Sequence, residues 1–277
     1  MTLAELVREA ARRIGGPDAR AEAEILAARA FGLSRAQLIA HGNGAAEPNG
    51  AQRLLQWADR RAEGWPIAYL TGTRGFWSLE LEVTPAVLIP RPETELLVEC
   101  ALARLPADRE GRAADLGTGS GAIALALVRE RPRLHVVATD RSEDALTVAR
   151  RNAARLGIDT VEFRMGDWLA ALRDERFDAI VSNPPYVAAG DLHLAQGDLR
   201  FEPRAALASG ADGLEAIRRI VAEAPMHLVP GGWLVLEHGY DQGERVRALL
   251  GAAGLAEVFT ARDLAGHERV SGGRALS

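Results

Sequence analysis

The fold is decided by the stretch Asp115-Leu116-Gly117-Thr118-Gly119-Ser120-Gly121, which lies where a short strand pattern gives way to a helical one. Glycines let the backbone turn sharply and approach a ligand, and the start of a helix offers free N–H groups to an anion. Because Ala122 follows, the stretch also satisfies the G-x-G-x-x-G/A dinucleotide fingerprint. It predicts a nucleotide-type ligand at a strand-to-helix turn and leaves the identity of that ligand open.

Strand and helix patterns alternate from Arg112 onward. The strand patterns cover 113–116, 134–139, 161–165, 177–181 and 233–237. The helical patterns begin near Gly121, cover 142–156, and include a long helix ending near Leu228. This order predicts a parallel, doubly wound sheet. Segments 256–260 and 268–275 follow with only a short polar interval between them, so we expect an antiparallel hairpin at the sheet edge.

The first 72 residues differ, because their apolar residues recur at the spacing of amphipathic helices. These helical faces cover 3–14, 23–30 and 51–62. Two short alternating patterns at 75–77 and 79–83 then predict a strand hairpin. The expected domains are a helical substrate-docking domain over 1–72, a hairpin and connector over 73–92, and the sheet domain over 93–277.

Two acids and a tryptophan follow the glycine stretch at the ends of the next two strand patterns. Asp140 is placed to accept hydrogen bonds from both ribose hydroxyls of a nucleoside, which NAD and S-adenosylmethionine both carry. Asp167, with Trp168 beside it, suits an adenine, because it offers a carboxylate to the amino group and an aromatic face to the ring. Asp140 alone could cap a helix and Trp168 could be ordinary core. Successive strand-end acids behind a glycine loop favour a nucleoside site.

A second informative stretch is Asn183-Pro184-Pro185-Tyr186, at the carboxyl end of the fourth strand pattern. Consecutive prolines fix φ and push each preceding residue into an extended conformation, so the loop is stiff before a ligand arrives. Pro185 has no N–H, which leaves the Pro184 carbonyl able to accept from a substrate, and Asn183 adds a side-chain carbonyl. Two acceptors on one short loop can hold one NH₂ group.

Such a loop suits transfer of a methyl group to a planar nitrogen. An amide nitrogen is a poor nucleophile because its lone pair is delocalised into the carbonyl. Holding both N–H bonds orients the nitrogen and favours the positively charging transition state, while Tyr186 supplies an aromatic wall. No strong base is needed, since a cationic methylated nitrogen loses its proton readily. The two stretches together predict an S-adenosylmethionine-dependent methyltransferase, although the second alone could be a proline-rich turn.

Composition limits the function classes. A net charge of -5 gives no global attraction to nucleic acid or an anionic membrane, so neither is an expected partner. All 33 basic residues are arginine, which excludes a lysine Schiff base. Cys100 is the only cysteine, and the histidines show no short-spaced ligand pattern, so we expect no disulfide and no metal. The first residues predict no signal peptide, and we expect a cytoplasmic monomer.

These stretches, with several others, closely resemble the release-factor glutamine methyltransferase family, known as PrmC or HemK. The narrower markers are Leu88-Ile89-Pro90-Arg91-Pro92-Glu93-Thr94-Glu95 and Arg200-Phe201-Glu202-Pro203. Further matches are 72–79, 115–121, 181–186, 236–239 and 268–270. The likeness covers nearly the whole chain, whereas the asparagine-diproline loop alone is shared with DNA adenine and rRNA guanine methyltransferases.

The resemblance implies a Rossmann-like class I fold with a seven-stranded, mostly parallel sheet. It also implies methylation of the side-chain nitrogen of the glutamine in the Gly-Gly-Gln loop of class 1 peptide chain release factors. The products would be N5-methylglutamine and S-adenosylhomocysteine, in support of translation termination. By the same resemblance, the helical domain helps to dock the release factor.

The resemblance also assigns the site residues. The cofactor residues are Gly117, Thr118, Gly119, Ser120 and Gly121 for the methionine part, Asp140 for the ribose, and Asp167 and Trp168 for the adenine. The catalytic residues are Asn183, Pro184, Pro185 and Tyr186 around the glutamine amide, with Asn183 also counted as a cofactor contact.

Three other functions remain open on the residues alone. The enzyme alternatives are an N6-adenine DNA or rRNA guanine N2 methyltransferase, which would act on a flipped base, and a dinucleotide dehydrogenase. A non-catalytic scaffold that engages release factors is the third. Arg91 could face the ligand or be solvated, and Phe201-Glu202-Pro203 could shape the substrate lip or merely anchor a loop.

Overall fold

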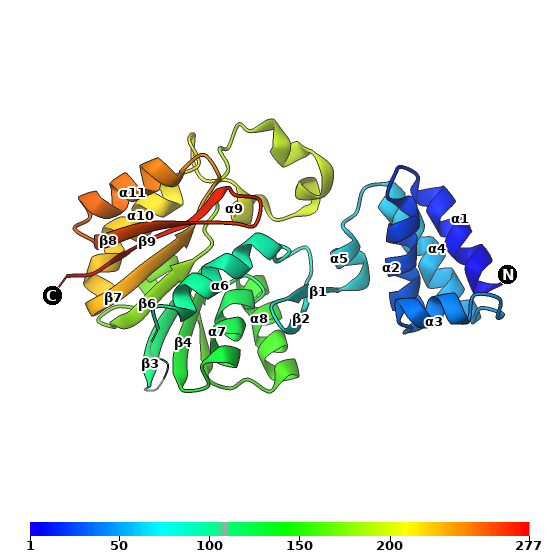
Figure 1. The fold of residues 1–277 in the computed structure, drawn as a ribbon, viewed down its shortest axis with the longest axis horizontal. Coiled ribbons are helices and arrows are strands. Elements are labelled where there is room, and N and C mark those ends of the chain that lie inside the picture. Colours follow the sequence, from blue (N-terminus) through cyan, green and yellow to red (C-terminus); the bar gives the residue numbers. More distant parts are fainter. Residues whose placement is uncertain (106, 108–109, 277) are drawn as a thin grey trace. The chain divides into compact units, whose positions relative to one another are not determined.

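The computed structural model describes residues 1–105, 107 and 110–276. Contacts divide these residues into two units. The helical unit comprises Met1–Thr73 and Gly197–Phe201, and the sheet unit comprises Arg74–Gln196 and Glu202–Ser277. Figure 1 draws the ribbon of both units.

The helical unit packs amphipathic helices around a small apolar core. Its helices are α1 (Leu3–Ile14), α2 (Ala19–Phe31), α3 (Arg35–Ala40), α4 (Pro48–Ala62) and α5 (Ile67–Thr71). Thr2 and Ser34 begin α1 and α3 with capping boxes, which satisfy backbone N–H groups that a helix start leaves unpaired. Helices α1, α2 and α4 bury Leu6, Leu26 and Leu54 against one another. Helices α3 and α5 were not anticipated, because so few turns show no periodicity.

A short segment from far along the chain also belongs to the helical unit. This segment is the 3-10 helix η4 (Gly197–Phe201). The Arg61 guanidinium, which is bonded to Glu22, donates to Asp198 over 2.9 Å. The Phe201 ring lies 4.8 Å from the Trp65 ring, centroid to centroid. We expected all of 93–277 in one domain, and these side-chain contacts instead group five of its residues with the helices.

The sheet unit contains a seven-stranded sheet with the order β5-β4-β3-β6-β7-β9-β8. Its strands are β3 (Gly111–Leu116), β4 (Leu134–Asp140), β5 (Val161–Met165), β6 (Phe177–Ser182), β7 (Leu228–Glu237), β8 (Ala256–Arg262) and β9 (Glu268–Arg274). Strands β3 to β7 are parallel, and β9 runs antiparallel between β7 and β8. A separate hairpin joins β1 (Thr73–Phe76) to β2 (Leu79–Glu82). The predicted doubly wound sheet with its C-terminal hairpin is confirmed.

Helices cover both faces of this sheet (Figure 1). Helices α6 (Glu95–Leu102), α7 (Ala122–Glu130) and α8 (Glu143–Leu156) lie on one face, and α10 (Glu215–Glu223) and α11 (Gly243–Ala252) on the other. Successive strand side chains point to opposite faces. Ala113 and Val136 accordingly join one apolar cluster, whereas Ala114 and Val137 join the other. Burial on both faces explains why the strand patterns are continuously apolar.

The connection from β6 to β7 departs from expectation. We expected a long helix ending near Leu228, but α10 has only nine residues and passes into the 3-10 helix η5 (Ala224–His227). Pro225 explains the change, because its ring and missing N–H do not allow an α-helix to continue. Before α10 come the short helices η3 (Leu192–Ala195) and α9 (Arg204–Leu207), and the segment between them, η4, belongs to the helical unit. The prediction of one long helix was therefore wrong.

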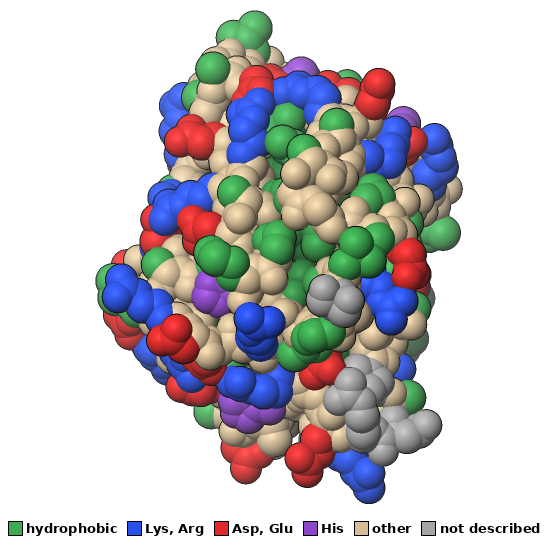
Figure 2. Space-filling view, turned by 90° about the vertical axis from the view of Figure 1, so that its left-hand side faces the viewer, with side chains coloured by type: hydrophobic (Ala, Val, Ile, Leu, Met, Phe, Trp, Pro, Cys, Tyr) green, Lys and Arg blue, Asp and Glu red, His purple; other side chains and the backbone are tan. Residues whose placement is uncertain are grey.

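The surface carries arginine and acidic side chains close together. Figure 2 shows both signs interspersed with neutral and apolar groups over the displayed face. Asp212 pairs with Arg218 and Arg245, and Glu175 pairs with Arg112 and Arg164. Such local pairing compensates many of the arginine charges. Within the described ranges, no helix is long and apolar enough to cross a membrane.

An ion pair anchors the connector to the segment that leads into α9. The Arg91 Nη2 atom donates to both carboxylate oxygens of Glu202 over 2.7 Å. The Glu202 side chain is fully buried, whereas 31% of the Arg91 side chain remains exposed. Arg91 is therefore held by an ion pair and is not a freely solvated arginine. It balances the charge of a buried carboxylate.

We expect Arg91→Leu to lower the free energy of unfolding by about 3 kcal/mol, because a buried carboxylate loses its charge partner. Chemical denaturation followed by fluorescence measures this change. The double variant Arg91→Leu/Glu202→Leu should recover much of the loss, since it buries no charge. The control is Arg150→Leu, whose partner Glu143 is exposed and whose loss should cost less than about 1 kcal/mol. Equal effects of the two single variants would contradict this account.

Candidate functional site

Three loops lie together at the carboxyl edge of the sheet, because the register of the strands aligns the residues from which these loops begin. Strand β3 pairs in parallel with β4 on one side and with β6 on the other. Leu116 is the register partner of both Thr139 and Ser182. The residues that come next are Gly117, Asp140 and Asn183. After β3, strands β4 and β5 are added on one side of it, and β6 is then added on its other side. Open α/β sheets bind ligands at the point where the strand order reverses in this way.

The glycine loop has a backbone that only glycine adopts readily. Gly117, Gly119 and Gly121 have φ values of 72°, 56° and 83°. A Cβ on Gly117 would lie 3.1 Å from the Trp168 ring, and one on Gly121 would lie 3.1 Å from Leu125. Two of the three glycines therefore combine a positive φ with close packing, and the loop lies directly against Trp168.

Asp115, a buried residue of β3, fixes the shape of this loop through hydrogen bonds. Its Oδ2 atom accepts from the Thr118 hydroxyl over 2.6 Å and from the Ala124 N–H over 3.1 Å. Burial raises the pKa of Asp115 to about 7, and the two hydrogen bonds oppose that rise. Thr118 and Ser120 are both buried, and the Ser120 carbonyl accepts from Asn152. These two residues shape the loop and do not line the pocket described below.

Asp140 presents a carboxylate held by two backbone groups. Its Oδ2 atom accepts from the Gly119 N–H over 3.0 Å, and its Oδ1 atom accepts from the Ser142 N–H over 2.9 Å. The cap of α8 is Ser142, whose hydroxyl accepts from the Ala145 N–H. Asp140 is thus bonded to the glycine loop and is not the helix cap. Each oxygen retains a lone pair for a further donor.

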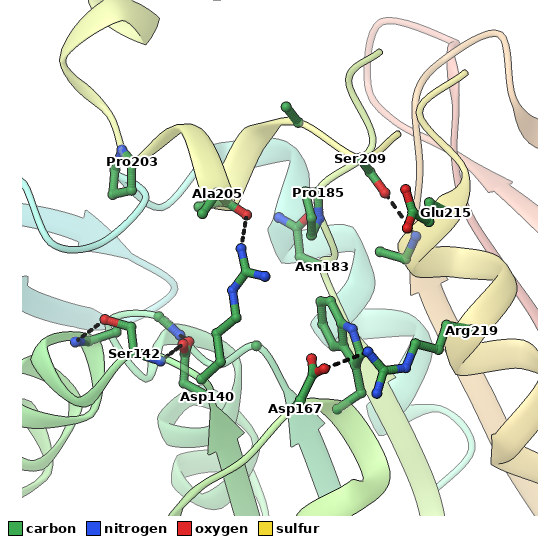
Figure 3. Close-up of a pocket in the computed structure, with 18 of the residues that line it drawn as sticks. Asp140, Ser142, Asp167, Asn183, Pro185, Pro203, Ala205, Ser209, Glu215 and Arg219 are labelled. Atoms are coloured by element: carbon green, nitrogen blue, oxygen red, sulfur yellow. Dashed lines mark hydrogen bonds and ion pairs between the residues drawn. The ribbon is translucent and has the colours of Figure 1, made fainter. Parts of the chain in front are cut away.

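Asp167 and Trp168 follow β5 on the same side of the sheet. Asp167 forms an ion pair of 2.5 Å with Arg219, which extends from α10 (Figure 3). Trp168 has a φ of 55°, an uncommon value for a bulky residue, and it packs against the apolar cluster that contains Ala114 and Val137. Trp168 therefore serves both the core and the ligand pocket.

The asparagine-diproline loop follows β6, and two of its oxygen atoms are free to accept hydrogen bonds from a ligand. The Asn183 Nδ2 group donates to the Thr94 hydroxyl over 3.1 Å. No hydrogen bond to the Asn183 Oδ1 atom or the Pro184 carbonyl forms within the part of the chain that the structure describes. These are the two oxygen atoms that the sequence singled out for gripping an NH₂ group.

Tyr186 points away from the pocket lining and into the protein. Its hydroxyl donates to the Glu237 Oε1 atom over 3.1 Å, and its carbonyl accepts from Gln242 over 2.9 Å. Burial and the neighbouring charge of Glu237 raise the pKa of Tyr186. Burial likewise raises the pKa of Glu237 to about 7, against the hydrogen bond from Tyr186. Tyr186 thus ties its loop to the end of β7.

A pocket of about 350 Å³ opens between these loops, within the usual range for small-molecule sites. Of the residues assigned in advance, its lining includes Gly117, Gly119, Asp140, Asp167, Trp168, Asn183 and Pro185. It does not include Thr118, Ser120, Gly121, Pro184 and Tyr186.

The opposite wall of the pocket was missed by the sequence analysis. It comprises parts of 203–210 together with Glu215, Ala216 and Arg219. The Arg141 guanidinium donates to the Ala205 carbonyl over 3.4 Å and so joins the two walls (Figure 3). Pro203, within the Arg-Phe-Glu-Pro stretch, was the one available signal for this wall. Within the described residues, no group of His, Cys, Asp and Glu side chains is placed to hold a metal.

Two family models match the chain. One described as the PrmC N-terminal domain matches residues 5–72, and one described as the Methyltransferase small domain matches residues 92–201. The solved structure of a methyltransferase from Pyrococcus furiosus superposes with a TM-score of 0.55 at 21% identity, covering 73% of this chain and 91% of that one. At this identity the likeness supports the fold alone.

Curated relatives are far more similar in sequence. A release factor glutamine methyltransferase of Xylella fastidiosa is 55% identical, covering 92% of this chain and 93% of its own length. Those of Pseudomonas aeruginosa and Escherichia coli are 54% and 47% identical, covering 93% and 97% of this chain and the same shares of their own lengths. This identity extends through both units of the structure. The chain belongs to the release factor glutamine methyltransferase family.

Proposed function

We propose that this protein transfers a methyl group from S-adenosylmethionine to the side-chain nitrogen of the glutamine in the Gly-Gly-Gln loop of class 1 release factors. The observation that carries the proposal is the pair of unused acceptors on Asn183 and Pro184, next to a nucleoside-type pocket. Family membership at about half sequence identity supports the same acceptor. The products are N5-methylglutamine and S-adenosylhomocysteine.

The pocket residues suit this cofactor. Asp140, with both oxygens fixed by backbone N–H groups, is poised to accept from the ribose hydroxyls. The bare backbone of the glycine loop allows the methionine part to approach closely, and Asp167 and Trp168 suit the adenine. When bound, S-adenosylmethionine supplies an electrophilic methyl group on a sulfonium centre. To bind the adenine amino group, Asp167 would share its carboxylate with Arg219 or exchange that partner.

The acceptor loop is suited to an amide NH₂ group. The Asn183 Oδ1 atom and the Pro184 carbonyl would each accept one N–H, which orients the nitrogen and excludes alternative poses. The same two oxygens stabilise the positive charge that develops on the nitrogen as it is methylated. The amide proton is lost afterwards to solvent or to one of these acceptors. No strong base is required of the chain.

The protein substrate distinguishes this proposal from its alternatives. Nucleic-acid methyltransferases share the asparagine-diproline loop, but the curated relatives match both the sheet unit and the helical unit. We propose that the helical unit helps to dock the release factor. A dehydrogenase would leave the two acceptors on Asn183 and Pro184 without a role.

Incubation of the protein with a release factor and labelled S-adenosylmethionine tests the reaction directly. Mass spectrometry should locate the label on the Gly-Gly-Gln glutamine. The Asn183→Ala variant should lose at least about a hundredfold in rate at saturating cofactor, because one of the two stabilising oxygens is gone.

The control substrate is the same release factor with that glutamine replaced by alanine, which should remain unlabelled. Methylation of duplex DNA or rRNA at an equal or greater rate would contradict the proposed acceptor. Full activity of the Asn183→Ala variant would contradict the role of the loop.

Asp140→Asn should weaken binding of S-adenosylmethionine by roughly ten- to a hundredfold, because a charged acceptor of ribose hydroxyls becomes neutral. Isothermal titration calorimetry measures the affinity. Asp144→Asn, an exposed substitution of the same kind on α8, is the control and should bind as wild type does. Tight binding of NADH without binding of S-adenosylmethionine would instead identify a dinucleotide enzyme.

A further inference from the structure

One ion pair joins the two walls of the ligand pocket. The Arg219 Nη1 atom, on α10, lies 2.5 Å from the Oδ2 atom of Asp167, the residue just before the 3-10 helix η2 (Trp168–Ala171) (Figure 3). Both residues line the pocket. The reaction proposed above assigns the adenine of the cofactor to Asp167 and gives Arg219 no role of its own.

The position of Arg219 is set by its helix and by two carboxylates. Helix α10 buries Ile217 and Ile220 in the core and packs against η2. The Arg219 Nε atom lies 3.5 Å from the Oε1 atom of Glu223, one turn further along the same helix. The guanidinium is thus held between Glu223 on its own helix and Asp167 at the end of β5.

The ion pair uses only one oxygen of Asp167. No hydrogen bond to the Asp167 Oδ1 atom forms among the residues that the structure describes. A carboxylate oxygen only accepts hydrogen bonds. Asp167 can therefore bind Arg219 through Oδ2 and an N–H group of a ligand through Oδ1 at the same time, so the ligand does not have to displace the arginine.

This pair contributes little to the stability of the fold. The side chains of Arg219 and Asp167 are 45% and 44% exposed, and exposed ion pairs are weak because water competes for both charges. A ligand in the pocket excludes part of that water, which strengthens the attraction between the two charges. The pair is therefore suited to act on the bound ligand more than on folding.

We infer that Arg219 is a specificity-determining residue, which fixes the Asp167 carboxylate so that its free oxygen selects a 6-aminopurine. The inference rests on the proposed function for the identity of the cofactor. Adenine offers an N–H donor to this oxygen, whereas a 6-oxopurine offers a carbonyl, so that two acceptors would face each other. Without Arg219 the carboxylate is free to turn into solvent. A water molecule in its place donates as readily as it accepts, and either purine then fits.

The test compares the binding of S-adenosylhomocysteine with that of S-inosylhomocysteine, in which a carbonyl oxygen replaces the amino group. Isothermal titration calorimetry measures both affinities. The wild-type protein should prefer S-adenosylhomocysteine by about a hundredfold, because S-inosylhomocysteine leaves the carboxylate oxygen without a donor. Arg219→Gln should lower this preference to about tenfold, through weaker binding of S-adenosylhomocysteine.

Two further variants separate this role from a general effect of charge. Arg218→Gln is the matched control on the same helix, because Arg218 pairs with Asp212 and does not line the pocket. It should keep the wild-type preference. Asp167→Asn should nearly abolish the preference, since a side-chain amide both donates and accepts. In that background Arg219→Gln should change the preference no further, because the carboxylate that Arg219 orients is absent.

A wild-type preference in Arg219→Gln would overturn the inference. Equal weakening of both ligands in that variant would also overturn it, since such a result indicates a general contact with the ligand. Arg219→Lys keeps a charge opposite Asp167 and should retain more of the preference than Arg219→Gln; a smaller preference would count against the inference.

The proposed function fails in a different way. If the wild-type protein does not bind S-adenosylhomocysteine, the cofactor of the proposed function is wrong, and if it does not methylate the glutamine, the acceptor is wrong. Neither result depends on Arg219, so these failures are distinguishable from failure of the inference.

Discussion

The parallel pairing of β3 with β4 and β6 is the constraint on which the rest of the site depends. Leu116 is level with Thr139 and Ser182, so the glycine loop, Asp140 and Asn183 all begin at one edge of the sheet. A one-residue slip in either pairing would turn every side chain of a strand to the opposite face. The apolar clusters on both faces oppose such a slip, because each strand buries alternate residues in both. Core packing thereby sets the geometry of the ligand site.

Three buried carboxylates hold the segments around the ligand site in place. Asp115 holds the glycine loop, Glu202 holds the segment that leads to the far wall of the pocket, and Glu237 holds the acceptor loop. Burying a charge is costly unless hydrogen bonds or an opposite charge compensate it. Asp115 and Glu237 receive hydrogen bonds from the loops that they fix, and Glu202 receives its opposite charge from Arg91 in the connector. Loops held in this way need little reorganisation when ligands bind, which is the condition for electrostatic stabilisation of a transition state.

The sequence was sufficient for the sheet and for the residues at the strand ends, because periodicity, glycines and prolines act locally. The predicted strands, the C-terminal hairpin and the pocket positions of Asp140 and Asn183 follow from such signals. The opposite wall around Arg219, the return of 197–201 to the helical unit, and the Thr94 bond to Asn183 could not be predicted. Each depends on contacts between residues far apart in the chain, which no local pattern encodes. Tyr186 illustrates the limit, since its residue type suggested a pocket wall and tertiary packing turned its hydroxyl to Glu237.

The most direct test of this account is a crystal structure of the protein with S-adenosylhomocysteine and a peptide that contains the Gly-Gly-Gln loop. The account predicts that the glutamine NH₂ group donates to both the Asn183 Oδ1 atom and the Pro184 carbonyl at about 3 Å, with the Asn183 nitrogen still on Thr94. The ribose hydroxyls should bond to Asp140. A glutamine amide bound elsewhere, or an Asn183 amide with its nitrogen toward the substrate, would contradict it.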